Sequence, residues 1–315
     1  MIEIKGLTKK YGQLTALNDL TIDVPEGSVV GFIGPNGAGK TTTMRILTTL
    51  MKPTSGEAWV NGYSVLTNPQ AVRRSIGYMP DFFGVYDDMK VWEYLDFFAA
   101  CYDIPASTRE GMIGDLLALV DLTHKYDAFV DSLSRGMKQR LCLARTLAHD
   151  PQVLILDEPA SGLDPRARIE MRELLLELRN MGKTIFFSSH ILSEVADICT
   201  SIAILEAGEL VTYGDIAEMK RLLRAHRLIQ VRILGDDMTP LQDFLLQAPN
   251  VTTITQDIDV DLPPNTLRFD FNGDDEALSQ LLRDMITQGL PVINFSEETG
   301  DLEDVFLQMT KGIVN

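Results

Sequence analysis

The sequence predicts an α/β fold built on a parallel β-sheet, followed by a smaller α+β domain at the C-terminal end. Two continuous apolar runs, at residues 29–33 and 153–156, have the length and composition of strands that are buried on both faces, as in a parallel sheet. Each run leads through a turn into a helical pattern. From about residue 222, strand and helix patterns alternate over a shorter span, which predicts a separate small domain.

Residues 34–41 form a glycine-rich loop, Gly-Pro-Asn-Gly-Ala-Gly-Lys-Thr. The spacing Gly, four residues, Gly-Lys-Thr is that of a phosphate-binding loop, in which backbone N–H groups and a helix N-terminus face one anion. We expect Lys40 to reach the β- and γ-phosphates of a nucleotide and the Thr41 hydroxyl to take a Mg²⁺ position. The other nucleotide contacts expected here are Gly34, Asn36, Gly37, Gly39 and Thr42, the last at the α-phosphate. The strand before the loop and the helix after it argue against a merely structural turn.

The overall charge and the cysteines argue against several classes of protein. The 315 residues carry a formal net charge of −17, which is unlike a surface built to neutralise nucleic-acid phosphates, so no nucleic-acid partner is expected. Cys101, Cys142 and Cys199 are widely spaced, so neither a disulfide framework nor a metal site is expected. No stretch reaches about 18 uninterrupted apolar residues, and the first residues lack a signal-peptide pattern. We therefore expect a protein of the reducing cytosol that does not itself cross a membrane.

Short strands are predicted on either side of the phosphate loop. The predicted elements are strands at 2–6, 19–33, 57–60 and 75–79, a turn at 25–27 and a short helix at 71–74. Tyr11 lies in a predicted loop of sequence Lys-Lys-Tyr-Gly. Its ring either stacks on a nucleotide base or covers a strand end, and its position alone leaves both interpretations open.

From Asp81 to about residue 148 the pattern becomes helical. The predicted helices lie around residues 91–101, 107–120 and 135–148, with polar breaks between them. Phe82, Phe83 and Tyr86 lie at the entry to this region. Such an aromatic cluster is either part of a core or a surface patch that another protein covers, and both interpretations stay open.

Asp157 and Glu158 end the apolar strand 153–156, at the edge of a parallel sheet where ligands bind. With a phosphate loop in the same chain, we expect Asp157 to hold Mg²⁺ through water and Glu158 to face a water aligned on the γ-phosphate. A periodic helix at 165–181 is predicted to pack on the sheet. The next strand ends at His190, which predicts a contact between this histidine and the γ-phosphate.

Further motifs occur in the order of a known family. Residues 133–140 read Leu-Ser-Arg-Gly-Met-Lys-Gln-Arg, and residues 161–164 read Ser-Gly-Leu-Asp. With the phosphate loop, the Asp157-Glu158 pair and Ser189-His190, they resemble the signature, D-loop and switch histidine of the ATP-binding cassette (ABC) ATPases, over roughly residues 1–220.

The resemblance implies an ABC-type ATP-binding domain at residues 1–221, with a P-loop, RecA-like core, an antiparallel β subdomain and a helical subdomain at about 81–148. It also implies a head-to-tail dimer with an identical or closely related chain. Two ATP molecules, with Mg²⁺, would be sandwiched in that dimer, each between one chain's phosphate loop and the other's signature.

The resemblance assigns roles to single residues. A helix that begins at Ser134 offers a hydroxyl, N–H groups and a dipole end to the γ-phosphate held by the partner, and Gly136 belongs to the same contact. The remaining implied roles are Mg²⁺ binding through water for Asp157, general base for Glu158, a γ-phosphate contact for His190, a place at the subunit boundary for Asp164 and base stacking for Tyr11.

Three positions depart from the family pattern. Arg135 and Met137 stand where the signature usually has Gly and Gln, while Ser134 and Gly136 are kept. Asp81 stands at the Q-loop glutamine, which approaches Mg²⁺ and couples the site to a partner. A shorter, charged side chain either approaches Mg²⁺ more strongly than glutamine does or senses it differently.

Within the family, the motifs are most similar to those of ABC-2 type exporter ATPases, whose transport path is a separate membrane permease. The resemblance implies that the segment with Phe82, Phe83 and Tyr86 grips a cytoplasmic helix of that permease. The chain would then be cytoplasmic and held at the membrane through its permease.

The tail, residues 222–315, holds 6 Lys or Arg against 16 Asp or Glu, which is −10 of the net charge of −17. The elements predicted in it are strands at 229–234, 251–256, 266–271 and 292–296 and helices at 240–248, 275–288 and 302–310. This order predicts a small ferredoxin-like domain. Its end, residues 302–307, resembles the C-terminal extension of the same exporter ATPases, with a regulatory or dimer-supporting role.

The sequence therefore predicts the ATP-hydrolysing subunit of an export-type membrane transporter. A soluble mechanical ATPase that acts on nucleic acid or ribosomes is the alternative. One cassette rather than two, the lack of a long heptad run and the acidic tail argue against it. A nucleotide switch without hydrolysis would need a damaged Glu158 or His190, and both residues are present.

Overall fold

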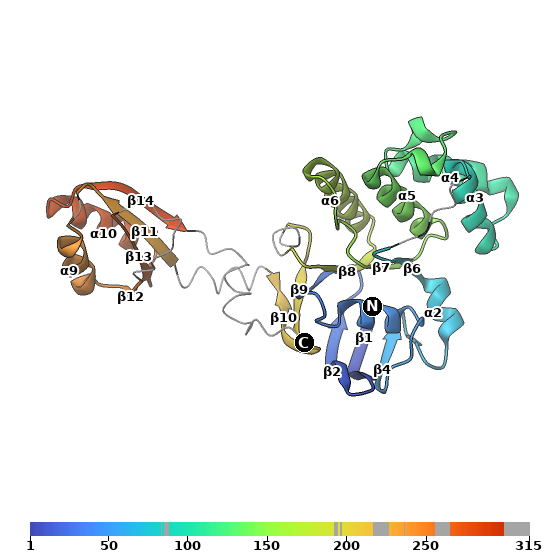
Figure 1. Ribbon diagram of the computed structural model, residues 1–315, viewed down its shortest axis with the longest axis horizontal. Coiled ribbons are helices and arrows are strands. Elements are labelled where there is room, and N and C mark those ends of the chain that lie inside the picture. The colour runs from blue at the N-terminus through green and yellow to red at the C-terminus, as the bar shows by residue number, and fades with distance from the viewer. Residues whose placement is uncertain are drawn as a thin grey trace. The chain divides into compact units, whose positions relative to one another are not determined.

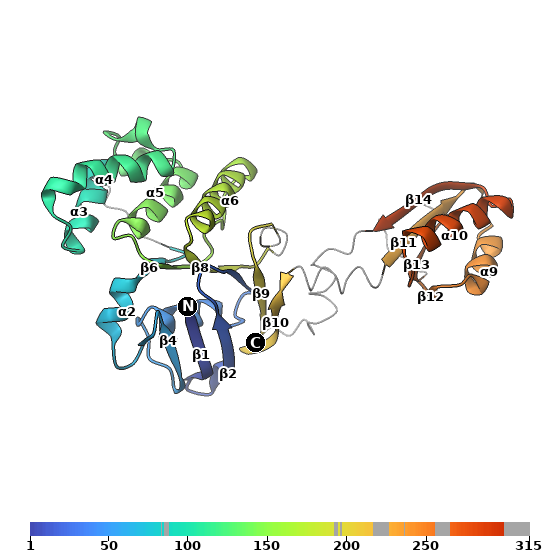
Figure 2. The same cartoon turned by 180° about the vertical axis from the view of Figure 1, so that it is seen from behind.

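The computed structural model describes residues 1–82, 84, 88–191, 195, 197–216, 227–235, 237–255 and 265–298. The chain divides into two compact units, of which the first contains Met1–Ile216 and the second is Ala217–Gln308. Figures 1 and 2 show the elements of both units from opposite sides. The predicted boundary at 221/222 falls between the described parts of the two units.

An antiparallel sheet begins the first unit. Its strands are β1 (Ile2–Tyr11), β2 (Leu14–Val24), β4 (Ser55–Val60) and β5 (Tyr63–Ser64), in the order β2-β1-β4-β5. The prediction of a strand only at 2–6 was wrong, because β1 continues to Tyr11, which pairs with Leu14 across a tight hairpin. This end of the hairpin is polar and largely exposed, so it lacks the alternation of apolar residues that identifies a half-buried strand.

A second sheet carries the phosphate loop. Its strands are β3 (Val29–Ile33), β6 (Ile76–Met79), β7 (Val153–Leu156), β8 (Thr184–Ser189), β9 (Ser201–Glu206) and β10 (Glu209–Asp215), in the order β10-β9-β3-β8-β7-β6. The pairs β3–β8, β3–β9, β7–β8 and β6–β7 are parallel. The carboxyl ends of β3, β7 and β8 therefore meet at one edge. Strands β9 and β10, for which no prediction was made, form a hairpin that turns at Ala207 and Gly208.

The core of the first unit lies between the two sheets. Buried residues of β1, β2 and β4 pack with α1 (Lys40–Leu47) against apolar residues of β3, β7, β8 and β9. Figure 1 shows α6 (Pro165–Asn180) on the opposite side of the parallel sheet, with the helical region beside it. A short helix, α2 (Pro69–Ser75), precedes β6. The phosphate-loop helix is thus held by packing on both of its sides.

The predicted helical region is confirmed almost residue for residue. It contains α3 (Val91–Cys101), α4 (Ala106–Leu119) and α5 (Arg135–Leu147), joined by 3₁₀ turns at Thr123–Lys125 and Val130–Ser132. Among the helices that the structure describes, none has the length and apolar composition needed to span a bilayer.

The second unit is a four-stranded antiparallel sheet with two helices. Its elements are β11 (Arg227–Ile233), α9 (Thr239–Gln247), β12 (Val251–Thr255), β13 (Thr266–Phe271), α10 (Asp275–Thr287) and β14 (Val292–Glu298). The strand order β12-β13-β11-β14 is that of a ferredoxin-like fold, as predicted. The alternating Leu267, Phe269 and Phe271 are buried in its core. The predicted helix at 302–310 lies outside the described residues.

Candidate functional site

The phosphate loop connects the buried strand β3 to α1. Gly39 has φ of 104°, and a Cβ at this position would lie 2.6 Å from the carbonyl oxygen of Ala16. A Cβ at Gly34 would lie 2.4 Å from the carbonyl oxygen of Leu205. Both glycines are therefore required by the backbone that surrounds the loop, in addition to any contact with a ligand.

Lys40 begins α1 and folds back over the loop. Its ammonium group donates to the carbonyl oxygens of Gly34 at 2.6 Å and Pro35 at 3.2 Å. The same Nζ atom lies 3.5 Å from Oε1 of Glu158. The residue is only 6% exposed, and burial lowers the pKa of its ammonium group, while the carboxylate of Glu158 opposes that shift. A buried cation with carbonyl and carboxylate partners can exchange them for phosphate oxygens.

Asp157 and Thr41 form the candidate Mg²⁺ position. The Thr41 hydroxyl donates to Oδ1 of Asp157 at 3.3 Å, and the Ser188 hydroxyl donates to the same oxygen at 2.7 Å. Asp157 is almost fully buried. No group of three or more His, Cys, Asp or Glu residues that could hold a metal occurs in the described part of the chain. One carboxylate and one hydroxyl fit Mg²⁺, because this ion is commonly held by one or two carboxylates and the oxygens of a bound phosphate.

Glu158 lies at the centre of the site. Its Oε2 atom accepts a hydrogen bond from Nδ1 of His190 at 2.7 Å, and its Oε1 atom faces Lys40. Its φ of 52° turns the chain sharply after β7. The backbone N–H of Glu158 donates to the Ser188 hydroxyl at 2.9 Å, which fixes this turn to β8. Two of the three predicted catalytic residues, Glu158 and His190, are thus in direct contact, while the third, Asp81, has no hydrogen bond or ion pair to either of them among the described residues.

Ser188 was missed as a site residue. Its hydroxyl accepts from the Glu158 backbone and donates to Asp157, so one buried side chain positions both acids. The sequence signal was a polar residue at the end of the otherwise apolar strand β8. That signal identifies the position but does not reveal the two partners, Asp157 and Glu158, which lie in the turn after β7.

Tyr11 is the last residue of β1 and not part of a loop, which corrects the prediction. Its side chain is 45% exposed, its hydroxyl donates to the sulfur of Met51 at 2.9 Å, and the Lys9 ammonium lies 5.2 Å from the ring centroid. The Lys9 ammonium group therefore lies over one face of the Tyr11 ring. No hydrogen bond among the described residues joins Tyr11 to the phosphate loop.

The signature and D-loop residues cap helices of their own chain. The Ser134 hydroxyl accepts from the Met137 N–H at 3.3 Å at the start of α5, and Oδ1 of Asp164 accepts from the Ala167 N–H at 2.9 Å at the start of α6. A Cβ on Gly136 would lie 2.9 Å from Cβ of Ala167, so this glycine permits close packing of α5 on α6. Within the described residues, neither Ser134 nor Asp164 is hydrogen-bonded to the phosphate loop.

Asp81 and Phe82 follow β6 in a bend and are exposed, Phe82 by 88%. The charge of Asp81 acts on Tyr78, whose pKa is raised to about 12, chiefly by burial and next by Asp157. No hydrogen bond or ion pair between described residues joins Asp81 to Thr41 or Asp157. Phe83 and Tyr86, predicted beside Phe82, lie outside the described residues.

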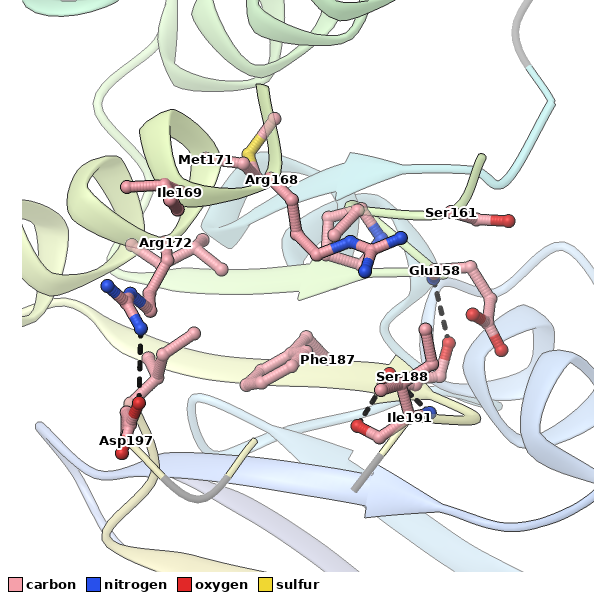
Figure 3. Close-up of a pocket in the computed structure, with 15 residues that line it drawn as sticks. Glu158, Ser161, Arg168, Ile169, Met171, Arg172, Phe187, Ser188, Ile191 and Asp197 are labelled. Atoms are coloured by element: carbon pink, nitrogen blue, oxygen red, sulfur yellow. Dashed lines mark hydrogen bonds and ion pairs between the residues drawn. The ribbon is translucent and has the colours of Figure 1, made fainter. Parts of the chain in front are cut away.

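A cavity of about 320 Å³ lies next to Glu158 (Figure 3). Its walls are the segment from Glu158 to Ser161, one face of α6 and the end of β8, including Phe187. Arg168 and Arg172 of α6 also line it, and Arg172 donates to Asp197 at 3.1 Å. The turn that carries Glu158 therefore has open space on one side.

Comparisons with known proteins agree with this arrangement. Residues 17–161 match the family described as "ABC transporter", and residues 214–310 match the family "ATP-binding protein DrrA1-3-like, C-terminal domain". The "Nod factor export ATP-binding protein I" of Ralstonia nicotianae is 33% identical, over 98% of this chain and 94% of that protein. The "Uncharacterized ABC transporter ATP-binding protein YxlF" of Bacillus subtilis is 34% identical, over 98% of this chain and 99% of that protein.

Two solved structures illustrate the similarity of fold. An "ATP binding subunit of ABC transporter" is 32% identical, with a TM-score of 0.64 over 71% of this chain and 93% of that one. The dimeric cassette MJ0796 in "a post-hydrolysis state", bound to ADP and phosphate, is 25% identical, with a TM-score of 0.63 over 69% of this chain and 99% of that one. Both similarities are to ATP-binding cassettes.

Proposed function

The chain belongs to the family of ATP-binding subunits of ABC transporters, and we propose that Lys40, Thr41, Asp157, Glu158 and His190 form its ATPase site. It is the ATPase of an export-type transporter, which is supported by its similarity to a protein named for Nod factor export and by its DrrA-like C-terminal domain. It functions with a membrane permease and as a dimer of cassettes. The relatives argue against the alternative of a mechanical ATPase acting on nucleic acid or ribosomes.

The observation that carries the assignment is the position of Glu158 between Lys40 and His190, beside the Asp157–Thr41 pair. When ATP binds, Lys40 exchanges its contacts with Gly34, Pro35 and Glu158 for oxygens of the β- and γ-phosphates. The carboxylate of Glu158 is then released to face a water aligned on the γ-phosphorus. We assign the loop residues Gly34, Asn36, Gly37, Gly39 and Thr42 to the phosphates and Tyr11 to the base.

Hydrolysis then follows from the two acids and the histidine. Water attacks the γ-phosphorus, its proton passes to Glu158, and the bond to the β-phosphate oxygen breaks, which leaves ADP and inorganic phosphate. Thr41, and Asp157 through water, would hold Mg²⁺, which would supply positive charge to the phosphate oxygens. Nδ1 of His190 donates to Glu158, so Nε2 is the ring nitrogen that can reach the γ-phosphate. A neutral imidazole carries only one N–H, so a hydrogen bond from Nε2 as well requires the imidazolium form. Asp81 is assigned to the outer side of the Mg²⁺ site.

We assign the signature to the partner's ATP. Ser134 is the N-cap of α5 and is exposed, so its hydroxyl and the first N–H groups of the helix are accessible to an anion from another subunit. In a head-to-tail dimer of identical or closely related chains, Ser134 and Gly136 of one chain would face the phosphate loop of the other. Asp164 would lie at the boundary between them.

We assign the permease contact to the bend after β6. Phe82 is 88% exposed, so its ring is accessible to a partner protein. Phe83 and Tyr86 belong to the same proposed contact. The chain would then be cytoplasmic and peripheral, held at the membrane through its permease.

Affinity purification from detergent-solubilised native membranes tests this assignment. We expect the tagged chain to recover a polytopic membrane protein, and Phe82→Ser to weaken that recovery. Leu246→Ser is the matched control, because Leu246 is an exposed apolar residue of the second unit. Recovery only from the soluble fraction, together with ribosomes or DNA, would overturn the transporter assignment while leaving the ATPase chemistry in place.

A further inference from the structure

Arg135, the signature residue that replaces the usual glycine, contacts the D-loop of its own chain. It is the first residue of α5, and its Nη2 atom donates to the carbonyl oxygen of Ser161 at 3.1 Å. Its guanidinium group also covers Gly162, since a Cβ on that residue would lie 2.4 Å from Cζ of Arg135. A glycine at position 135 would have neither contact.

Two other contacts join α5 to α6, but they lie beyond the D-loop. Gly136 packs against Ala167, and Nη2 of the buried Arg140 lies 3.5 Å from Oε2 of Glu170. Arg140 is held in place by a second bond, in which its Nη1 atom donates to the carbonyl oxygen of Val120 at 3.1 Å. These contacts place the two helices relative to each other. Only Arg135, among the described residues of α5, is hydrogen-bonded to the segment between Glu158 and Asp164.

That segment begins at the proposed general base. The Ser161 N–H donates to the Glu158 carbonyl at 3.0 Å, so the turn that carries Glu158 ends at the residue held by Arg135. The cavity shown in Figure 3 borders Glu158 through Ser161 on the side of α6 and β8. The turn from Glu158 to Ser161 therefore borders open space on that side, and two hydrogen bonds connect Glu158 through Ser161 to Arg135.

We propose that Arg135 is a positioning residue that couples the two ATP sites of the dimer, by linking the Glu158–Gly162 turn of its own site to Ser134 of the signature. The coupling rests on the proposed function, in which Ser134 serves the ATP held by the partner. The side chain of Arg135 then connects Glu158, the proposed general base of one site, to Ser134, which contacts the ATP of the other site. The state of Glu158 in one site is thereby transmitted to ATP binding in the second.

The test compares the ATP dependence of turnover in the full-length chain and its variants. We expect positive cooperativity in the wild type and a Hill coefficient of about 1 for Arg135→Gly, as in uncoupled sites. Arg135→Lys keeps one donor but not the planar group over Gly162, so intermediate cooperativity is expected. Arg166→Gln is the matched control: it removes an exposed guanidinium that pairs with Glu170 within α6, and it should leave the cooperativity unchanged.

A second variant disrupts the contact between Arg135 and Gly162 by changing Gly162 instead of Arg135. Gly162→Ala places a methyl group where the guanidinium lies and should reproduce the loss of cooperativity. Because Gly162 has φ of 64°, alanine also strains the backbone in both backgrounds, but in the Arg135→Gly background it should change the cooperativity little, since the contact is already absent. ATP-induced dimerisation, measured by sedimentation with Glu158→Gln in every chain, separates coupling from assembly. Loss of cooperativity with unchanged dimerisation supports the proposal.

Each other outcome contradicts the proposal in a recognisable way. A non-cooperative wild type, an unchanged Hill coefficient in Arg135→Gly, or a dimerisation defect in that variant would each overturn the coupling role while leaving the ATPase assignment intact. Absence of ATP hydrolysis by the wild type, by contrast, would contradict the proposed function itself.

Discussion

Nδ1 of His190 donates to Oε2 of Glu158 at 2.7 Å, although the two residues are separated by 32 positions along the chain. The parallel register of β7 and β8 brings them together, since Leu156 pairs with Phe187 at the ends of these strands. The carboxylate also faces Lys40 at 3.5 Å. The proposed base is therefore in contact with the two groups that are expected to bind the γ-phosphate.

Glu158→Gln is expected to lower turnover by about 10²–10⁴-fold, because an amide cannot accept the proton of the attacking water. ATP binding should be retained or strengthened, because the variant removes a carboxylate that competes for Lys40. Phosphate release and nucleotide affinity measure the two effects separately. Glu173→Gln, an exposed glutamate of α6, is the control. Retained turnover would refute the role of Glu158.

Lys40→Ala is expected to weaken ATP binding by roughly 10–100-fold, the size of one or two lost charge-assisted hydrogen bonds. The variant also leaves the carbonyl oxygens of Gly34 and Pro35 without this donor. Titration of the purified chain with a fluorescent ATP analogue measures the affinity. An affinity equal to that of the wild type would contradict the assignment of the whole phosphate loop.

Ser188→Ala is expected to destabilise the first unit by about 1–3 kcal/mol, because it leaves the part-buried N–H of Glu158 without its acceptor and removes one of the two hydroxyl donors to Oδ1 of Asp157. Turnover should fall more than ATP affinity, since Ser188 positions the acids rather than the phosphate loop. Urea denaturation and steady-state kinetics provide the two measurements. If the rate and the stability both stay at wild-type values, Ser188 has no positioning role.

Gly136→Ala is expected to destabilise the chain by about 1–3 kcal/mol through overpacking against Ala167. This clash opposes the gain of about 1 kcal/mol that alanine brings to a helix. The double variant with Ala167→Gly removes the clash, so in that background Gly136→Ala should no longer destabilise. Thermal or urea unfolding of the four proteins completes the cycle. If Gly136→Ala changes the free energy of unfolding equally in both backgrounds, the contact between positions 136 and 167 does not contribute to stability.

The lowered pKa of His149 predicts that the free energy of unfolding decreases in mildly acidic solution. Burial lowers the pKa of this histidine below its ordinary value of 6.5, and its ring stacks on Tyr102 at 3.7 Å. The unfolded chain therefore takes up the proton near pH 6.5, while the folded chain does so only at lower pH. The free energy of unfolding should fall as the pH drops from about 6.5 through the folded-state pKa, and this residue should have no effect on it above that range.

Urea denaturation at a series of pH values measures this contribution. His149→Gln keeps a donor for the carbonyl of Ile76 and should flatten the dependence between neutral and mildly acidic pH. His124→Gln, at an exposed histidine, should leave the dependence as in the wild type. Parallel pH curves for His149→Gln and the wild type would show that other groups cause the acid sensitivity.

The elements that could be predicted from the sequence are those whose signal lies in contiguous residues. The apolar runs of β3 and β7, the periodic helices α5 and α6 and the alternating strand β13 each carry their period locally. The far end of the hairpin β1–β2 could not be predicted, because polar, exposed strand residues differ little from a loop. Tyr11 was assigned to a loop for that reason.

Motif spacing alone determined which residues of this protein we assign to the proposed site: the phosphate loop around Lys40, the acids after β7 and the histidine after β8. A glycine-rich loop, a strand end and a helix start are local features, so composition and spacing along the chain are enough to recognise them. Only the tertiary structure decided how these residues meet. The register of the parallel strands brings Glu158 to His190 and lets the Ser188 hydroxyl form its two hydrogen bonds. The packing of α5 on α6 brings Arg135 to Ser161. These relations join residues that are distant in the chain, so no local pattern encodes them.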